Sequence, residues 1–387
     1  MACFVIISDR ARAHEDATLL SGVARAGCLI FQNPRTLLEE LGALEDRILL
    51  FVDLQPKTYE LLECFRLLGQ ARFTGTLILT GASDARTAYS ASVLARYFGL
   101  DVMRCLTAAT TEQDILSILI DWEVRPQVTR RAIRKTYTSE EIREAIEKKQ
   151  LVNYYQPKIS LADHRFQGVE LLARWDHPED GLVFPDQFIA VAEESSLIDD
   201  LTLAVLERGL EDFGKWKANN LQPEIAINLS MESLQRPRFI EQLRHALVSQ
   251  PAYAPLITLE VTESRLMRDP LCVLSALTKL RLGSLILSID DFGTGHASLA
   301  QLRDIPFDEI KIDRGFISDV HRNDIHRAIY QGIISMAQGM GIRTVAEGVE
   351  TADEFDFLRK TGCDYAQGYL IARPMSADDI LSFAKNA

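Results

Sequence analysis

The sequence lacks the cysteine patterns that organise many small or metal-bound proteins. It has six cysteines, and no two of them form a CxxC pair. Scattered single thiols are typical of reduced intracellular proteins, and they argue against a disulfide scaffold or a structural zinc site. The cysteines are Cys3, Cys28, Cys64, Cys105, Cys272 and Cys363.

The chain also lacks an excess of positive charge and a long hydrophobic run. Its formal net charge is -13, whereas a protein that binds a nucleic-acid polymer normally presents a basic surface. No stretch approaches the roughly 18 apolar residues of a membrane helix. The first apolar run follows no basic segment and soon turns polar, which indicates a strand and not a signal peptide. We therefore expect a cytoplasmic protein with no nucleic-acid polymer as partner and no membrane insertion.

The length of 387 residues is too great for one ordinary hydrophobic core and predicts two domains. Residues 1–122 alternate short apolar runs with helical patterns, which predicts a doubly wound, five-stranded parallel sheet. Residues 123–137 contain a proline and several basic residues, and we expect them to connect the two domains. The five predicted strands are 3–8, 28–31, 47–53, 76–81 and 101–106.

Residues 138–387 have the typical length of a (β/α)8 barrel. Thr138 and Glu141 have the spacing of a capping box, so a helix is predicted to begin there. Only a hairpin-length link separates the first two strand candidates, which predicts that they pair antiparallel. The eight candidates are 151–159, 166–175, 224–230, 257–263, 285–291, 309–313, 343–349 and 365–371.

Polar residues interrupt these apolar strands near their C-terminal ends. Active sites of such barrels are built from the C-terminal ends of several strands, so we expect these residues to meet at one face. A structural role, such as capping a helix, readily explains one polar residue at a strand end. It does not readily explain a series to which every strand contributes, so the series indicates a functional site. The series is Gln156, Glu170, Asn228, Glu260, Glu263, Asp290, Asp291, Lys311, Asp313, Glu347, Glu350 and Gln367.

Five residues of this series offer the oxygen ligands that Mg²⁺ or Mn²⁺ prefers. A cluster of so many carboxylates requires cations to neutralise it. Because Asp290 and Asp291 are adjacent, they predict a pair of metal ions, which would activate water and stabilise an in-line phosphoryl displacement. The five residues are Glu170, Asn228, Glu260, Asp290 and Asp291.

Two cationic side chains are expected to complete this site. Lys311 shares a strand face with Asp313 and could hold the attacking water or neutralise a phosphate. Arg174 follows Glu170 by four residues on the same strand face, where it could clamp a phosphate oxygen.

Residues 138–387 resemble the EAL domain, the phosphodiesterase of the bacterial second messenger cyclic di-GMP. The family signature stands here as ELLARW, in which Glu170 and Leu172 keep the outer letters and Leu171 replaces the alanine. The resemblance implies a barrel that hydrolyses one phosphodiester of cyclic di-GMP to give linear pGpG. The other matching motifs are NLS at 228–230, EVTE at 260–263, DDFGTG at 290–295, KID at 311–313, EGVE at 347–350 and QGY at 367–369.

The resemblance also implies roles for the matching metal ligands. Glu170, Asn228, Glu260 and Asp290 would bind one Mg²⁺ or Mn²⁺, and Asp290 with Asp291 would bind the second. Ca²⁺ is expected to inhibit, because its looser coordination would misplace the water.

The remaining motif residues would act on water, loop or substrate. Lys311 would orient or deprotonate the nucleophilic water, Glu347 would hold a metal-bound water, and Gln367 would assist. Glu263 would tether the loop that begins at Asp291, and Glu350 would support the site. The residues expected to contact substrate are Gln156, Leu172 and Arg174.

Residues 1–122 resemble a response-regulator receiver of a two-component system. Asp53 ends the third predicted strand, where receivers carry the phosphoacceptor, and Thr80 ends the fourth, where they carry the switch hydroxyl. Asp9 follows the first strand, but Ser8 stands where a second acid is usual, and no lysine occurs between Lys57 and Lys135. The sequence is compatible with phosphorylation at Asp53 or with a docking or dimerising domain that is not phosphorylated. The expected partner is a sensor kinase or another protein that docks to the receiver.

Three functions compete for the whole chain. The first is a metal-dependent cyclic di-GMP phosphodiesterase regulated by a receiver-like domain, and the second is a catalytically inactive EAL domain that binds the nucleotide and signals through protein partners. The third is a different Mg²⁺-dependent barrel enzyme, which would need a second basic residue opposite Lys311 that the strand positions do not supply. Because every predicted metal ligand is present, we favour the first. Both families commonly self-associate, so we also expect a homo-oligomer.

Overall fold

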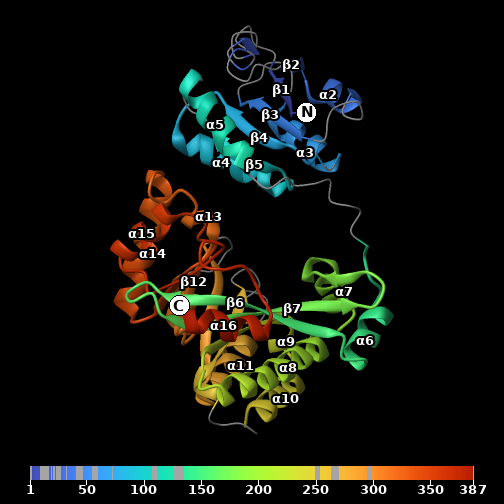
Figure 1. Ribbon diagram of the computed structural model, residues 1–387, viewed down its shortest axis with the longest axis vertical. Coiled ribbons are helices and arrows are strands. Elements are labelled where there is room, and N and C mark those ends of the chain that lie inside the picture. Colours follow the sequence, from blue (N-terminus) through green and yellow to red (C-terminus); the bar gives the residue numbers. More distant parts are fainter. Residues whose placement is uncertain are drawn as a thin grey trace. The chain divides into compact units, whose positions relative to one another are not determined.

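The computed structural model shows two compact units, residues 1–134 and 135–387 (Figure 1). The boundary lies inside the segment that we predict as a connector. The structure describes residues 2–8, 17–18, 20, 22, 28–31, 33–40, 47–54, 60–71, 73–106, 111–124, 135–248, 253–262, 270–293 and 299–386.

The N-terminal unit is a parallel sheet in the order β2-β1-β3-β4-β5. Two apolar clusters cover its two faces, since neighbouring residues such as Val5 and Ile6, or Leu49 and Leu50, belong to opposite clusters. This arrangement confirms the predicted doubly wound sheet. The strands are β1 (Ala2–Ile7), β2 (Cys28–Phe31), β3 (Arg47–Asp53), β4 (Thr76–Thr80) and β5 (Asp101–Cys105), and the described helices are α2 (Pro34–Glu40), α3 (Leu61–Gln70), α4 (Ala85–Tyr97) and α5 (Glu112–Val124).

The C-terminal unit is a closed barrel in the order β6-β14-β13-β12-β11-β10-β9-β7, with β6 paired to β7. Strand β6 runs antiparallel to both β7 and β14, whereas the other barrel pairs are parallel. The predicted antiparallel first strand is therefore confirmed. The barrel strands are β6 (Leu151–Ser160), β7 (Phe166–His177), β9 (Glu224–Leu229), β10 (Ile257–Thr262), β11 (Ile286–Phe292), β12 (Glu309–Ile312), β13 (Arg343–Ala346) and β14 (Tyr365–Gln367).

One strand and several short helices escape the sequence prediction. β8 (Gly181–Val183) extends β7 as an outer hairpin. The predicted capping box is present, because the Thr138 side chain accepts from the Glu141 N–H and the Glu141 side chain accepts from the Thr138 N–H. The helices are α6 (Ser139–Glu147), α7 (Ile189–Glu194), α8 (Ile198–Ala218), α9 (Met231–Leu234), α10 (Pro237–Val248), α11 (Pro270–Leu282), α12 (Leu299–Asp304), α13 (Arg314–Ile317), α14 (Asp324–Met340), α15 (Ala352–Lys360) and α16 (Ala377–Asn386).

Alternation along the barrel strands separates an apolar outer layer from a polar interior. On β12, Ile310 and Ile312 belong to the apolar core, whereas Glu309 and Lys311 lie on the opposite strand face. Among the described helices, none is both long and apolar enough to cross a membrane.

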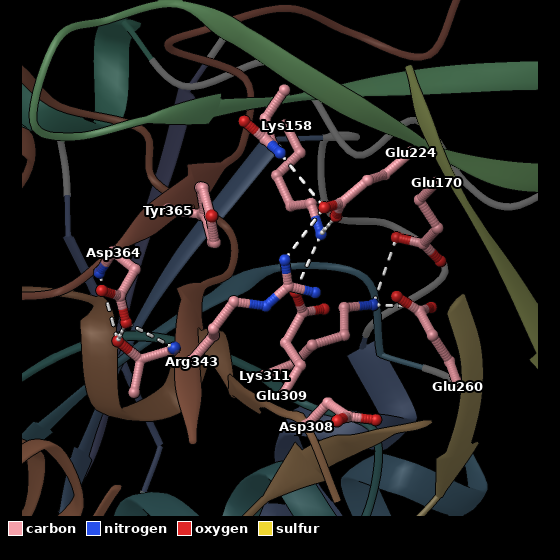
Figure 2. A network of polar contacts seen from close by, with 12 residues as sticks. Lys158, Glu170, Glu224, Glu260, Asp308, Glu309, Lys311, Arg343, Asp364 and Tyr365 are labelled. Carbon is pink, nitrogen blue, oxygen red and sulfur yellow. Dashed lines mark hydrogen bonds and ion pairs between the residues drawn. The ribbon is translucent and has the colours of Figure 1, made fainter. Parts of the chain in front are cut away.

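A buried charge network occupies the N-terminal end of the barrel interior (Figure 2). Lys158 Nζ lies 2.9 Å from Glu309 Oε2 and 3.4 Å from Glu224 Oε2, and Arg343 pairs with Glu224 at 2.9 Å and with Glu309 at 3.4 Å. Glu309 is 0% exposed. Two cations thus balance two carboxylates across β6, β9, β12 and β13, which ties the antiparallel strand to the parallel ones.

Replacing Lys158 by methionine should leave Glu309 without one of its two cations. Removing one partner of a buried ion pair costs about 3–5 kcal/mol, because the remaining charge stays desolvated. We expect Lys158→Met to lower the free energy of unfolding of the C-terminal unit by that amount, measured by urea denaturation with the fluorescence of Trp175 and Trp216. The control is Lys148→Met, an exposed lysine paired with Glu144, for which we expect a change within about 0.5 kcal/mol. Equal midpoints for the two variants would contradict the proposed structural role.

Candidate active site

Seven of the twelve polar residues predicted to meet line a cavity of about 320 Å³ at the C-terminal ends of the parallel strands. Gln156 reaches the same place from the antiparallel strand β6, because it pairs with Glu170 of β7. The described lining residues are Gln156, Glu170, Leu172, Asp290, Lys311, Arg314, Glu347, Gly348, Glu350, Gln367, Gly368 and Tyr369.

The ammonium group of Lys311 lies among four carboxylates, and Figure 2 shows its contacts with two of them, Glu170 and Glu260. Its Nζ atom is 2.7 Å from Glu347, 2.8 Å from Glu260, 3.1 Å from Asp290 and 3.3 Å from Glu170. The side chain is only 2% exposed. Burial alone would lower the pKa of Lys311, but the surrounding carboxylates outweigh burial and raise the pKa well above its ordinary value.

Besides Lys311, donors from two other strands hold Glu170. Asn228 Nδ2 donates to Glu170 Oε1 at 2.9 Å, and Gln367 Nε2 donates to Oε2 at 2.5 Å. Gln367 also donates to Gln156 Oε1 at 3.2 Å. Burial opposes ionisation of Glu170, but Lys311 and these donors lower its pKa below the ordinary value.

The other carboxylates show that negative charge is in excess. Burial and the neighbouring acids Asp290 and Glu170 raise the pKa of Glu347 to about 8, although Lys311 acts in the opposite direction. Burial likewise raises the pKa of Glu260 well above its ordinary value. Protonation or a further cation would relieve the repulsion between these carboxylates.

Backbone geometry explains how two adjacent aspartates serve one site. Neighbouring residues of a regular strand point to opposite faces, but the β11–β12 pairing shifts register between Ile289 and Phe292. Asp291 has a φ of 52°, in the left-handed region that aspartate tolerates better than most residues. As a result, carboxylate oxygens of Asp290, Asp291 and Glu347 all lie within 4.8 Å of one another.

This geometry fits a divalent cation. The three converging carboxylates offer oxygen ligands, and burial together with Asp290 raises the pKa of Asp291 to about 6. Glu170 and Glu260 contribute further oxygens beside Asp290, all within reach of the same Lys311 ammonium. The residues present therefore suit Mg²⁺ or Mn²⁺ chemistry better than the nitrogen and sulfur ligands of zinc.

Not every predicted residue lies in the cavity. Arg174 is absent from the described lining; its guanidinium lies 4.9 Å from the ring centre of Phe184 and 5.7 Å from that of Tyr154, and it donates to the Ala173 carbonyl at 2.7 Å. Its contact with substrate stays a prediction. Glu263 lies outside the described residues, and so do residues 294–298, which include the last two residues of the DDFGTG motif.

The receiver-like site is buried. Asp53 is 7% exposed, and Ser8 Oγ donates to its Oδ2 at 3.0 Å. Thr80 Oγ1 donates to the Val52 carbonyl at 3.4 Å, so this hydroxyl lies beside the same strand end. Asp9 lies outside the described residues. Ser8 thus occupies the position of the missing second acid as a hydrogen-bond donor.

Two lining side chains were missed by the sequence prediction. Arg314 directly follows the KID motif, and Tyr369 is the last residue of the QGY motif. Their motif positions were the available signal, but the sequence alone did not show that α13 and the segment after β14 contribute to the cavity lining.

Comparison with known proteins assigns the family. The EAL domain model matches residues 139–374. The chain belongs to the EAL domain family. The motif resemblance in the sequence is thereby confirmed, as is the barrel fold.

Relatives and solved structures agree with this assignment. The chain is 41% identical over 250 residues to "Cyclic di-GMP phosphodiesterase NbdA" of Pseudomonas aeruginosa, covering 64% of this chain and 32% of that protein. It is 35% identical over 253 residues to "Cyclic di-GMP phosphodiesterase PdeR" of Escherichia coli, covering 65% and 38%. The solved structure "PaMucR Phosphodiesterase, c-di-GMP complex" matches with a TM-score of 0.59 and 38% identity, covering 62% of this chain and 98% of that one. The chain thus spans about a third of the length of these curated relatives.

Replacing Gly368 tests whether the cavity wall must be tightly packed where Gly368 meets Val349. A Cβ at Gly368 would lie 2.2 Å from both the N and O atoms of Val349, so one of the two segments must move. We expect Gly368→Ala to lower the free energy of unfolding by about 1–3 kcal/mol. It should also weaken Mn²⁺ binding in calorimetric titration, because Gln367 would no longer hold Glu170.

The matched control for Gly368→Ala is Gly332→Ala, on the exposed side of α14. A Cβ there meets nothing within 4 Å, so the change should preserve Mn²⁺ binding and stabilise the helix by up to about 1 kcal/mol. Unchanged stability and Mn²⁺ affinity in Gly368→Ala would show that the packing of this wall is not required.

Proposed function

We propose that the C-terminal unit hydrolyses cyclic di-GMP to linear pGpG in a reaction that depends on Mg²⁺ or Mn²⁺. The observation that carries this proposal is the excess of carboxylates around Lys311 in a cavity of the barrel. Relatives named cyclic di-GMP phosphodiesterases, and a phosphodiesterase solved with cyclic di-GMP, support the choice of substrate.

The metal ligands in this proposal are Glu170, Asn228, Glu260, Asp290 and Asp291. Bound there, a pair of divalent cations would lower the pKa of water and neutralise charge on the reacting phosphodiester. Gln367 and Asn228 keep Glu170 oriented through the hydrogen bonds described above. Metal binding would therefore use carboxylates that the protein already holds in place.

The remaining residues of the site orient the reactants. Lys311 directs the attacking water from its buried Nζ, and Glu347 accepts a hydrogen bond from that water. The water oxygen bonds to phosphorus and gives up one proton to Glu347, while the bond from phosphorus to one ribose O3′ breaks. That oxygen takes up a proton from bulk water, so the ribose leaves with a 3′-hydroxyl group. Gln156 and Leu172 line the cavity where the substrate would lie.

An inactive, nucleotide-binding effector is the alternative. Loss of a metal ligand or of the central lysine would favour it. In this chain all five proposed ligands and Lys311 are present, and Lys311 contacts three of them. We therefore prefer the enzyme.

We infer that the N-terminal unit regulates the barrel as a docking or dimerising domain and is not phosphorylated at Asp53. The burial of Asp53 and the hydroxyl of Ser8 in place of an acid support this inference. A sensor kinase or other docking protein as partner, a homo-oligomeric state and a cytoplasmic location all stay predictions.

Incubating the full chain with cyclic di-GMP tests the proposed reaction. We expect pGpG in Mg²⁺ or Mn²⁺ and inhibition when Ca²⁺ is added, because Ca²⁺ tolerates a looser ligand geometry. Asp290→Ala should reduce pGpG formation below detection by chromatography. The control Asp356→Ala removes an exposed carboxylate paired with Arg359 on α15 and should leave the rate unchanged. Turnover by Asp290→Ala at the wild-type rate would refute the metal assignment.

Labelling with radioactive acetyl phosphate tests the inference about Asp53. We expect the wild type to incorporate no more label than Asp53→Ala, since Ser8 stands where receivers carry a second acid and no lysine occurs between Lys57 and Lys135. Label that is acid-stable, base-labile and lost in Asp53→Ala would show phosphorylation and overturn the inference.

A further inference from the structure

Among the described residues that line the cavity, one cationic side chain is available to an anionic ligand from solvent. The described lining includes the carboxylates of Glu170, Asp290, Glu347 and Glu350 but only two cationic side chains, Lys311 and Arg314. Lys311 is buried and already surrounded by four carboxylates. Arg314, in contrast, has a side chain that is 54% exposed. It is therefore the lining cation, among the described residues, that can meet a ligand arriving from solvent.

The backbone of Gly348 holds the stem of Arg314 in place. A Cβ at Gly348 would lie 2.6 to 2.8 Å from the Cγ, Cβ and Cδ atoms of Arg314, and Gly348 has a φ of 63°. The two segments can thus approach only because position 348 carries no side chain. An arginine stem packed in this way loses less conformational entropy when its head group binds a ligand.

The segments on both sides of Arg314 are fixed as well. Asp313 Oδ1 caps α13 by accepting the Gly315 N–H at 2.8 Å. Glu354, which is 4% exposed, accepts the backbone N–H groups of Glu350 and Asp319, at 3.0 and 3.1 Å. These contacts tie the end of the EGVE motif to the segment that follows α13, so Arg314 and Glu350 are presented by anchored backbone.

The partner of Arg314 leaves its guanidinium largely available. Nη2 lies 2.8 Å from Glu350 Oε2, and the Glu350 side chain is 38% exposed. Exposed ion pairs of this kind contribute only about 0–1 kcal/mol, so a ligand has little to displace. A guanidinium has five N–H donors in a planar fork, and it binds phosphate oxygens strongly.

We propose that Arg314 binds the phosphodiester of cyclic di-GMP that is not cleaved, and that Glu350 orients Arg314 for this contact. The inference rests on the proposed function, since it takes cyclic di-GMP as substrate. The substrate carries two phosphodiesters. One lies at the reaction centre, where the metal ligands and Lys311 act, and the other requires a separate cation at the cavity mouth.

Calorimetric titration of cyclic di-GMP into the full chain in EDTA tests the proposal without turnover. We expect Arg314→Met to raise Kd by about 10-fold or more, as expected for losing a hydrogen bond to a charged group. Arg314→Lys should fall between Arg314→Met and the wild type, because it keeps the charge but not the fork. The control Arg359→Met removes the same charge from an exposed ion pair on α15 and should leave Kd unchanged.

A substrate with a single phosphodiester separates this role from a structural one. With bis(p-nitrophenyl) phosphate and Mn²⁺, the kcat/KM of Arg314→Met should stay within about 2-fold of the wild type, whereas its KM for cyclic di-GMP should rise about 10-fold. An equal loss with both substrates, or an unchanged Kd for cyclic di-GMP, would overturn the proposal. A wild type that binds cyclic di-GMP without hydrolysing it would contradict the proposed function alone, because the Kd comparison would still test Arg314.

Discussion

The ammonium group of Lys311 lies within 3.3 Å of carboxylates from four residues, and the rest of the C-terminal unit is arranged around this buried contact. Charges taken out of water must be compensated by partners that the fold supplies. Each carboxylate here comes from a different strand or from the segment following one, so the closed barrel itself provides the compensation. Negative charge remains in excess, and this excess suits the site to the divalent cations that we propose it binds.

The same constraint applies at the other end of the barrel interior. Glu309 and Lys311 are two residues apart on β12 and share its inner face, so one short strand carries a member of each charge network. The network at the N-terminal end of the barrel interior has balanced charges, because Lys158 and Arg343 face Glu224 and Glu309. The network around Lys311 has more carboxylates than cations. This difference distinguishes a group of charges that stabilises the barrel from one that is suited to bind ligands.

Much of the fold and site followed from local patterns. Strand alternation predicted both sheets, the short link predicted the antiparallel β6, and polar strand ends predicted where Glu170, Asp290 and Lys311 would meet. The sequence could not show the register shift and left-handed Asp291 that turn two adjacent aspartates to one side. Such a shift depends on pairing between β11 and β12, which no local pattern encodes.

Long-range contacts also explain what the sequence prediction missed around the cavity. The sequence does not single out Arg314, because the position of its stem depends on Gly348, a residue distant in the chain that leaves space for it. For Arg174, whose contact with substrate stays a prediction, the sequence did not show that the rings of Tyr154 and Phe184 lie beside its guanidinium. The short strand β8 escaped notice because only its pairing with β7 defines it. In each case tertiary packing, and not residue type, decides the outcome.

The central claim is that the unbalanced carboxylates hold a pair of divalent cations bridged by Asp290. Anomalous diffraction from crystals of the full chain grown with Mn²⁺ and pGpG tests it most directly. The account predicts two manganese peaks, with the Asp290 carboxylate bonded to both. Crystals with fewer than two manganese peaks at this site, or with two peaks that the Asp290 carboxylate does not bridge, would contradict it.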